Sequence, residues 1–192
     1  QEVLTMESII QTADHRVWQE ENSLVVEFKE PKTVISTSQF NGGIKTNIQA
    51  IFNHQIPAIE HIHELPGGSV PAYLAYTANK LGLEPKTSVG LLTAASMKNM
   101  AWDRLSHKAL AVEAYITAGV DVNGGRAGDP AAYYEEAENF YTLGGTINTL
   151  LLIQANLSPG ALVKSIITAT EAKTAALQEL VTPSRYSRGL AT

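Results

Sequence analysis

Cysteine is absent from this chain of 192 residues. Its absence excludes thiolate catalysis, disulfides, and zinc or iron–sulfur sites built on cysteine ligands. No apolar run approaches the roughly 18 residues of a transmembrane helix, and no secretory hydrophobic segment opens the chain. We therefore expect a soluble, cytoplasmic protein.

Basic residues are few: 14 lysines and arginines stand against 19 acidic residues, which gives a formal charge of −5 at pH 7. They form no cluster, so the chain lacks the positive patch that holds nucleic-acid phosphates. An anionic membrane surface is disfavoured for the same reason. Neither nucleic acid nor a membrane is expected as a partner.

Hydrophobic residues, in contrast, make up 44% of the chain, which is enough to bury one good core at this length. The patterning predicts an α/β (α+β) fold, a single domain of residues 1–192 with a mixed β-sheet covered by helices. The expected strands are 24–28 and 33–36, joined as a hairpin through Glu30-Pro31-Lys32, and then 89–94, 110–118 and 145–154. The expected helices are 45–52, 71–81 and 159–180.

The predicted helix 159–180 carries a lysine where its apolar stripe should continue. At 3.6 residues per turn, Thr170 and Lys173 lie between Leu162, Ile166 and Leu177. A buried lysine must pair with an anion, reach a wet cavity or lose its proton. The alternative is a stem that extends past the helix edge to water.

We predict from this phase that Lys173 is largely buried and contacts a carboxylate. The nearest candidates are Glu113 on the predicted strand 110–118 and Asp129 in the loop after it. The same prediction places Lys173 in one cleft with Thr117 and His54.

A pair of glycines follows the second predicted strand, in Phe40-Asn41-Gly42-Gly43, and precedes the predicted helix 45–52. At a helix start, backbone N–H groups and the helix dipole can hold an anion or an oxyanion. The alternative is a plain turn between a strand and a helix.

The predicted strand 110–118 alternates apolar residues with Glu113, Tyr115 and Thr117, which share its second face. A glycine-rich loop with Arg126 and Asp129 follows it. Loops that start at strand ends often carry function because the sheet fixes their position. In the alternative reading this is a flexible loop in which Arg126 and Asp129 pair with each other.

Four segments follow one another along the chain: residues 40–57 (FNGGIKTNIQAIFNHQIP), 89–97 (VGLLTAASM), 112–129 (VEAYITAGVDVNGGRAGD) and 145–180 (GTINTLLLIQANLSPGALVKSIITATEAKTAALQEL). In this order they resemble the signature blocks of the adenosylcobinamide amidohydrolase (CbiZ) family. That family hydrolyses the amide joining aminopropanol to a propionyl side chain of the corrin ring in adenosylcobinamide. The product, adenosylcobyric acid, is salvaged into cobalamin. The resemblance implies a cytoplasmic amidohydrolase with a corrinoid substrate.

One departure concerns the end of the chain. Members of the family generally continue beyond Thr192 into a Gly/Thr-rich segment with an aspartate, and this sequence stops before it.

The implied reaction assigns roles to residues in the blocks. Amide hydrolysis needs an activated water or nucleophile, oxyanion stabilisation and a proton for the leaving amine. His54 is the expected general base, because imidazole titrates near about pH 6.5, and Asp129 is expected to orient it. The nucleophile stays open among Thr117, Thr93, Thr170 and water. Thr170 and Lys173, three apart on a helix, resemble the nucleophile–lysine pair of other acyl-transfer enzymes.

The other candidate residues suit the many primary amides of a corrinoid edge, with turn and capping duty as the alternative. The predicted binding residues are Asn41, Gly42, Gly43, Asn53, Gln55, Thr93, Asn123, Arg126, Asn148 and Thr170.

No cofactor and no protein-bound metal is expected, since the corrinoid cobalt enters with the substrate. Glu60-His61-Ile62-His63-Glu64 offers four potential ligands, yet a solvated acidic loop fits that segment better. His54 has a rival role as a ligand to the substrate cobalt. The sequence does not separate that role from general-base catalysis.

Two functions of other classes stay open. One is a corrinoid-binding or carrier module without hydrolysis. The other is a different acyl-transfer enzyme or a self-processing amidase. A homo-oligomer is also left open.

Overall fold

The computed structural model describes residues 7–56, 62–120, 124–130, 135–136, 139–140 and 146–192. The chain divides into two compact units, residues 1–93 and residues 94–192, and each is described by itself. That residues 1–192 form a single domain stays a prediction.

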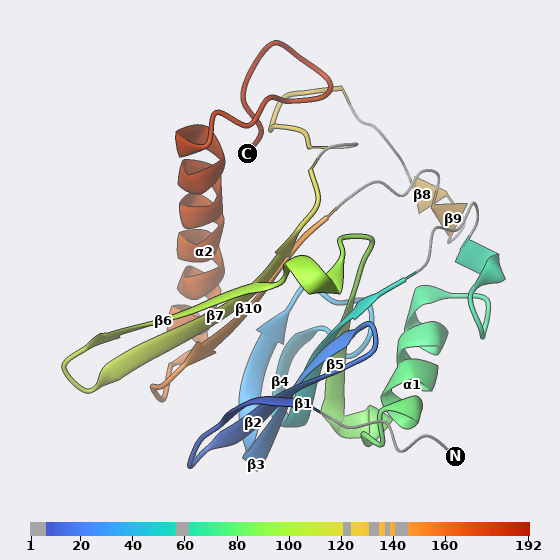
Figure 1. Cartoon of the computed structure of the whole chain (residues 1–192), viewed down its shortest axis with the longest axis vertical. Coiled ribbons are helices and arrows are strands. Elements are labelled where there is room, and N and C mark those ends of the chain that lie inside the picture. Colours follow the sequence, from blue (N-terminus) through green and yellow to red (C-terminus); the bar gives the residue numbers. More distant parts are fainter. Residues whose placement is uncertain (1–6, 57–61, 121–123, 131–134, 137–138, 141–145) are drawn as a thin grey trace. The chain divides into compact units, whose positions relative to one another are not determined.

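Unit 1 is built on a five-stranded mixed sheet in the order β1-β2-β3-β4-β5 (Figure 1). Its strands are β1 (Glu7–Gln11), β2 (His15–Glu20), β3 (Ser23–Ser36), β4 (Gly43–Gln55) and β5 (Ser88–Thr93). The first four pair antiparallel, whereas β4 and β5 are parallel. The 3₁₀ turn η1 (Ile62–Glu64), helix α1 (Val70–Lys80) and the 3₁₀ turn η2 (Pro85–Thr87) form the crossover between those two strands.

Two sequence expectations in unit 1 are wrong. Residues 24–36 form one strand and not a hairpin, because β3 continues through Pro31 at a register shift in its pairing with β4. Proline has no backbone N–H to donate. A β-bulge tolerates it because the hydrogen bonds between the strands are already interrupted there.

Residues 45–52 form part of strand β4 and not a helix. Ile48, Ile51 and Phe52 mimic helical spacing because β4 is buried on both faces from Ala50 onward. A strand buried on both sides loses the simple alternation that identifies it.

Helix α1 matches its prediction. Ser69 caps it by accepting a hydrogen bond from the Ala72 N–H, Pro71 lies in the first turn, and Gly82 with φ +72° follows its end. Its inner face carries Leu74 and Ala78 onto the sheet.

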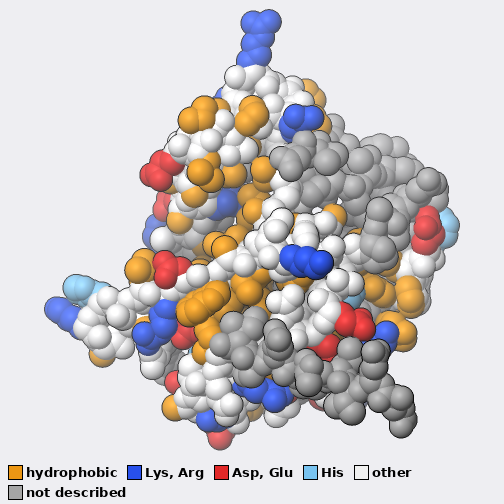
Figure 2. Space-filling model, viewed as in Figure 1, with side chains coloured by type: hydrophobic (Ala, Val, Ile, Leu, Met, Phe, Trp, Pro, Cys, Tyr) orange, Lys and Arg blue, Asp and Glu red, His pale blue; other side chains and the backbone are white. Residues whose placement is uncertain are grey.

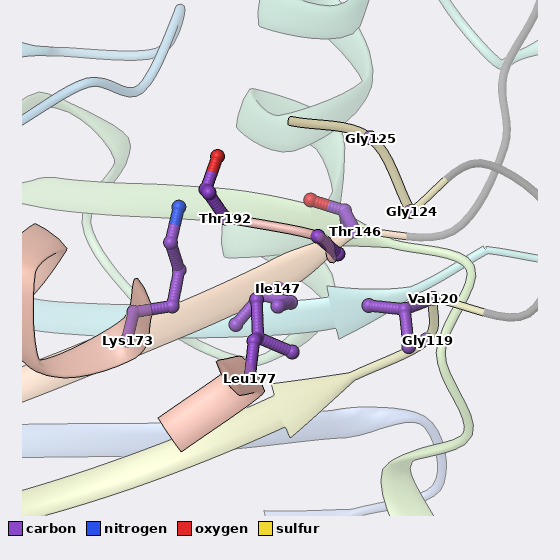
Figure 3. Close-up of a pocket in the computed structure, with 10 residues that line it drawn as sticks. Gly119, Val120, Gly124, Gly125, Thr146, Ile147, Lys173, Leu177 and Thr192 are labelled. Atoms are coloured by element: carbon purple, nitrogen blue, oxygen red, sulfur yellow. The ribbon is translucent and has the colours of Figure 1, made fainter. Parts of the chain in front are cut away.

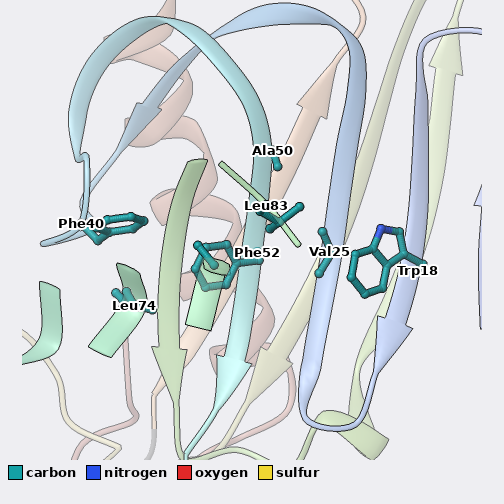
Figure 4. Packing of buried hydrophobic residues seen from close by; sticks show 8 residues of the cluster. Trp18, Val25, Phe40, Ala50, Phe52, Leu74 and Leu83 are labelled. Atoms are coloured by element: carbon teal, nitrogen blue, oxygen red, sulfur yellow. The ribbon is translucent and has the colours of Figure 1, made fainter. Parts of the chain in front are cut away.

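The core of unit 1 is apolar on both faces of the sheet. Pairing aligns Trp18, Val25 and Phe52 across β2, β3 and β4, under α1 (Figure 4). On the opposite face, Val17 and Val26 are fully buried. The central part of the sheet is therefore buried on both faces, and polar side chains lie near the ends of its strands.

Unit 2 contains a three-stranded antiparallel sheet in the order β10-β7-β6 (Figure 1). These strands are β6 (Ala101–His107), β7 (Leu110–Ala118) and β10 (Ile147–Ile153). The 3₁₀ turn η3 (Met97–Asn99), the two-residue strands β8 (Glu135–Glu136) and β9 (Asn139–Phe140), and helix α2 (Pro159–Glu179) complete the described elements.

The α/β class with a mixed sheet is confirmed, as are strands 89–94, 110–118 and 145–154 to within a few residues. The three strands do not share one sheet, however, because β5 pairs with β4 whereas β7 pairs with β10. Helix α2 begins at the predicted Ser158-Pro159 cap. None of the helices in the described residues combines the length and the apolar character that crossing a bilayer requires.

Candidate functional site

His54 lies near the end of β4, on the face that α1 covers. Its Nδ1 is 2.7 Å from the Ser23 hydroxyl, on the neighbouring strand, and its Nε2 is 3.0 Å from the Tyr73 hydroxyl on α1. Strand pairing sets Ser23 opposite His54, and the helix crossover brings Tyr73 over the ring. Three side chains distant in sequence thus form one hydrogen-bonded chain.

The pKa of His54 is lowered from 6.5 to about 4, mainly by burial and also by the Lys80 charge, while the Glu21 charge opposes both. The imidazole is therefore neutral at pH 7, and one of its nitrogens can accept a proton. Burial also raises the pKa of Tyr73. Its hydroxyl stays protonated and able to donate.

Ser23 is 2% exposed, so the Nδ1 side of the imidazole faces the interior. Tyr73 stacks on Tyr76 with ring centroids 6.4 Å apart, and Tyr76 is 46% exposed. The Lys80 ammonium lies 5.7 Å from the centre of the Tyr76 ring. Tyr73, which contacts Nε2, is only 9% exposed, so this side of the imidazole is also covered, and Tyr76 is the exposed side chain beyond it.

Asn53, Gln55 and Thr93 lie on the sheet face opposite to His54. Asn53 and Gln55 flank His54 on β4, and Thr93 pairs in register with Gln55 at the carboxyl ends of the two parallel strands. Asn53 and Thr93 are almost fully buried. Ligands commonly bind at this edge of a parallel pair, and the binding role of the three residues stays a prediction.

The Asn41-Gly42-Gly43 segment is not at a helix N-terminus, since it leads into strand β4. The Asn41 amide donates to the carbonyls of Pro85 and Ser88, at 2.8 and 2.7 Å. A Cβ at Gly42 would overlap the Ser38 carbonyl oxygen, and Gly43 has φ +77°. The expected helix N-terminus is therefore wrong, the Asn41 side chain holds the turn in place, and the binding role of the segment stays a prediction.

In unit 2, the polar face of β7 points inward. Glu113, Tyr115 and Thr117 are buried, and Asn148 of β10 pairs in register with Thr117 on the same face. The Tyr115 hydroxyl donates to Glu113 at 2.9 Å, and Arg104 of β6 lies 3.4 Å from the other Glu113 oxygen. Two predicted residues, Thr117 and Asn148, are thus brought together.

Asp129 organises its own loop. It accepts hydrogen bonds from the Ser184 hydroxyl at 2.5 Å and from the Arg126 backbone N–H at 2.9 Å. The Ser184 bond, with a further one from Ser187, lowers its pKa. Ser23 and Tyr73 contact the two ring nitrogens of His54, and the orienting role of Asp129 stays a prediction. The alternative pairing of Arg126 with Asp129 is present as a backbone hydrogen bond and an electrostatic attraction that lowers the pKa of Asp129.

Lys173 shares the inner side of α2 with Leu162, Ile166 and Leu177, so the predicted phase is right. Lys173 is partly buried, but the predicted carboxylate contact is wrong, because Lys173 forms no ion pair with a described carboxylate. Thr170 is exposed and donates to the Ile166 carbonyl one turn back, at 2.9 Å. The described contacts do not link the two side chains, and their role as a catalytic pair stays a prediction.

Lys173 does not share a pocket with Thr117 either. It lines one with Ile147, whereas Thr117 projects with Asn148 from the opposite face of the sheet. Asn123 and His61 lie outside the described residues. No group of three or more metal-ligating side chains occurs among the residues that are described. Lysines, arginines and acidic residues intermingle on the visible described surface in Figure 2.

The family comparison fits the blocks found in the sequence. The model of the adenosylcobinamide amidohydrolase family matches residues 6–192. The chain belongs to this family. An adenosylcobinamide amidohydrolase of Methanosarcina mazei is 34% identical over 139 residues, which cover 72% of this chain and 57% of the relative. An uncharacterised protein of Methanocaldococcus jannaschii is 34% identical over 176 residues, covering 84% of this chain and 65% of the relative.

This adenosylcobinamide amidohydrolase family member thus spans less than two thirds of the length of both relatives. No solved structure matches the chain.

Sequence reasoning missed Ser23 and Tyr73, the two partners of His54. Ser23 lies outside the four matched blocks, and Tyr73 sits in an ordinary amphipathic helix. A hydrogen-bonding side chain on the inner face of that helix was the available signal. The sequence does not show that Tyr73 contacts His54, because that contact depends on the crossover that places α1 over β4.

Proposed function

We propose that this protein hydrolyses the aminopropanol amide of adenosylcobinamide to give adenosylcobyric acid in corrinoid salvage. The observation that carries the proposal is family membership across residues 6–192. The described residues contribute a neutral, hydrogen-bonded imidazole at His54, which lies within one of the family blocks.

His54 is proposed as the general base. In the proposed tautomer, Nδ1–H donates to the Ser23 hydroxyl and Nε2 is the acceptor, at the place that the Tyr73 hydroxyl now occupies. A water molecule that replaces the Tyr73 hydroxyl at Nε2 loses its proton to the ring as its oxygen attacks the amide carbon. A general base of this kind contributes a factor of about 100 to 10,000 in rate.

The same ring then serves as the acid. When the tetrahedral intermediate collapses, the carbon–nitrogen bond breaks and the imidazolium returns its proton to the departing amine of aminopropanol. The depressed pKa favours this step, because a weakly basic imidazole releases its proton readily. Charge and protons balance over the cycle, and the product is a carboxylic acid that ionises.

The test is His54→Ala assayed for aminopropanol release from adenosylcobinamide, with corrinoid binding followed by absorbance. We expect a loss of about 100-fold or more in turnover with binding retained. His107→Ala is the matched control, since His107 is exposed on β6 and should not change turnover.

Ser23→Ala and Tyr73→Phe should each have a smaller effect than His54→Ala, because they orient the base and do not replace it. Unchanged turnover in folded His54→Ala refutes the base assignment. Corrinoid binding by the wild type without any aminopropanol release supports the carrier function instead.

A further inference from the structure

A pocket of about 250 Å³ opens in unit 2 between the end of β7, the start of β10 and helix α2. Its lining includes Lys173 and Leu177 from α2 and Ile147 from β10. Typical sites for whole small molecules start at roughly 300 Å³. This pocket is therefore matched to one end group of a ligand.

Polar and apolar groups are separated within the pocket. Figure 3 shows the Lys173 ammonium and the side-chain oxygens of Thr146 and Thr192 on one side, with Ile147 and Leu177 on the other. The Thr192 hydroxyl accepts a hydrogen bond from the Ala127 N–H at 3.1 Å. Its own proton has no acceptor among the described residues.

Glycines bring the backbone close to this space. Gly124 and Gly125 line the pocket, and a Cβ at Gly124 would come within 2.8 Å of the Val120 carbonyl oxygen. The Gly124 N–H bonds that same oxygen at 3.0 Å, which closes the loop tightly. Hydrogen bonds from Thr192 to Gly125 and from Arg185 to Gly124 fix the loop to the segment after α2. The wall opposite Lys173 is thus firmly placed.

The charge of Lys173 selects the ligand class. Lys173 is half-buried and its ammonium has no described carboxylate partner, so an anion that enters the pocket gains an interaction that no described residue supplies. One positive charge balances a monoanion, and the adjoining Ile147 and Leu177 suit a few methylene groups. A dianionic phosphate would leave one charge uncompensated.

We propose that this pocket binds a carboxylate carried on a short aliphatic chain, with Lys173 as its counter-ion and the Thr192 hydroxyl as a second donor. The proposal stands on unit 2 alone. Only the natural ligand rests on the proposed function, because hydrolysis of a propionyl amide leaves a propionate of this class.

The experiment is an NMR titration of the purified protein with sodium propionate, following the backbone amides of Gly119 and Gly125. Propionamide, the neutral analogue, and inorganic phosphate are titrated in parallel. We expect saturable shifts with propionate and at least about tenfold weaker binding of propionamide, since a hydrogen bond to a charged group is worth that factor.

Lys173→Met keeps the volume of the stem and should weaken propionate binding about tenfold or more, while Lys173→Arg should retain most of it. Lys164→Met, at an exposed lysine of the same helix, is the matched control and should bind as the wild type does. Circular dichroism verifies that each variant is folded.

Equal affinities for propionate and propionamide, or an unchanged affinity in Lys173→Met, would overturn the proposal. Tighter binding of phosphate than of propionate would overturn the carboxylate class. Turnover of adenosylcobinamide is measured separately. Saturable propionate binding without turnover would support this binding site and refute the proposed function.

Discussion

The sheets of the two units bury different chemistry. In unit 1, the inward positions of the central strands carry apolar side chains such as Val25, Val26 and Phe52. In unit 2, the inward face of β7 carries Glu113, Tyr115 and Thr117. In β7 the buried side chains come from one face by period-two alternation, whereas the central strands of unit 1 bury consecutive apolar side chains because both faces of the sheet are covered.

The difference shows which parts of the molecule are tied to exact partners. Apolar burial is non-directional, so unit 1 tolerates exchange between residues of similar volume. A buried polar face is stable only while each group keeps its hydrogen bonds, so unit 2 depends on specific pairs such as Tyr115 with Glu113. In unit 1, the Ser23–His54–Tyr73 chain is one group of side chains that likewise depends on specific hydrogen bonds.

The largest effect is expected in the apolar core of unit 1. Phe52→Ala removes a fully buried ring that packs with Phe40 and Leu74, and should lower the free energy of unfolding by about 3–5 kcal/mol. Urea titration measures the change. Ile44→Ala on the same strand, where the side chain is 45% exposed, is the control. Similar losses in the two variants would remove the contrast between core and surface along β4.

The next effect is a pH dependence at His54. Its pKa is about 4 in the folded state against 6.5 when unfolded, so between these values the unfolded chain binds a proton that the folded chain does not. Stability is therefore complete above pH 6.5 and is lost as the pH falls toward 4. The loss is on the order of 2 kcal/mol, allowing for the partly exposed ring.

The measurement is urea unfolding at pH 7 and pH 4 for the wild type, His54→Gln and His107→Gln. The wild type and His107→Gln should lose more stability on acidification than His54→Gln does. If all three lose the same amount, the imidazole is not held neutral by burial.

The smallest effect is expected at the polar face of unit 2. Burial raises the pKa of Tyr115, and the neighbouring Glu113 raises it further, so the hydroxyl remains a donor. Tyr115→Phe deletes that donor while Arg104 still contacts the carboxylate, and should cost about 1–2 kcal/mol. Thermal unfolding measures it, with Tyr76→Phe at an exposed tyrosine as the control. A neutral Tyr115→Phe would mean that water satisfies Glu113 as well as Tyr115 does.

Local signals in the sequence were enough for the elements whose pattern is unambiguous. The Ser158-Pro159 cap located the start of α2, Gly82 located the end of α1, and the alternation of 110–118 located β7. The four ordered blocks were enough for the family. They placed His54 among the candidates without revealing what holds it.

Tertiary structure decided the rest, because burial on both faces and long-range pairing leave no local trace. It made residues 45–52 a strand, since β4 is covered on both sides, and so placed Asn41-Gly42-Gly43 in a hydrogen-bonded turn before a strand and not at the expected helix start. Thr170 is exposed, and Lys173 lies at a pocket without a described carboxylate partner. The reason is that the buried face of α2 is narrower than the apolar stripe of its sequence. Strand pairing brought Ser23 to His54, 31 positions away in the sequence, and the helix crossover brought Tyr73, which is 19 positions away.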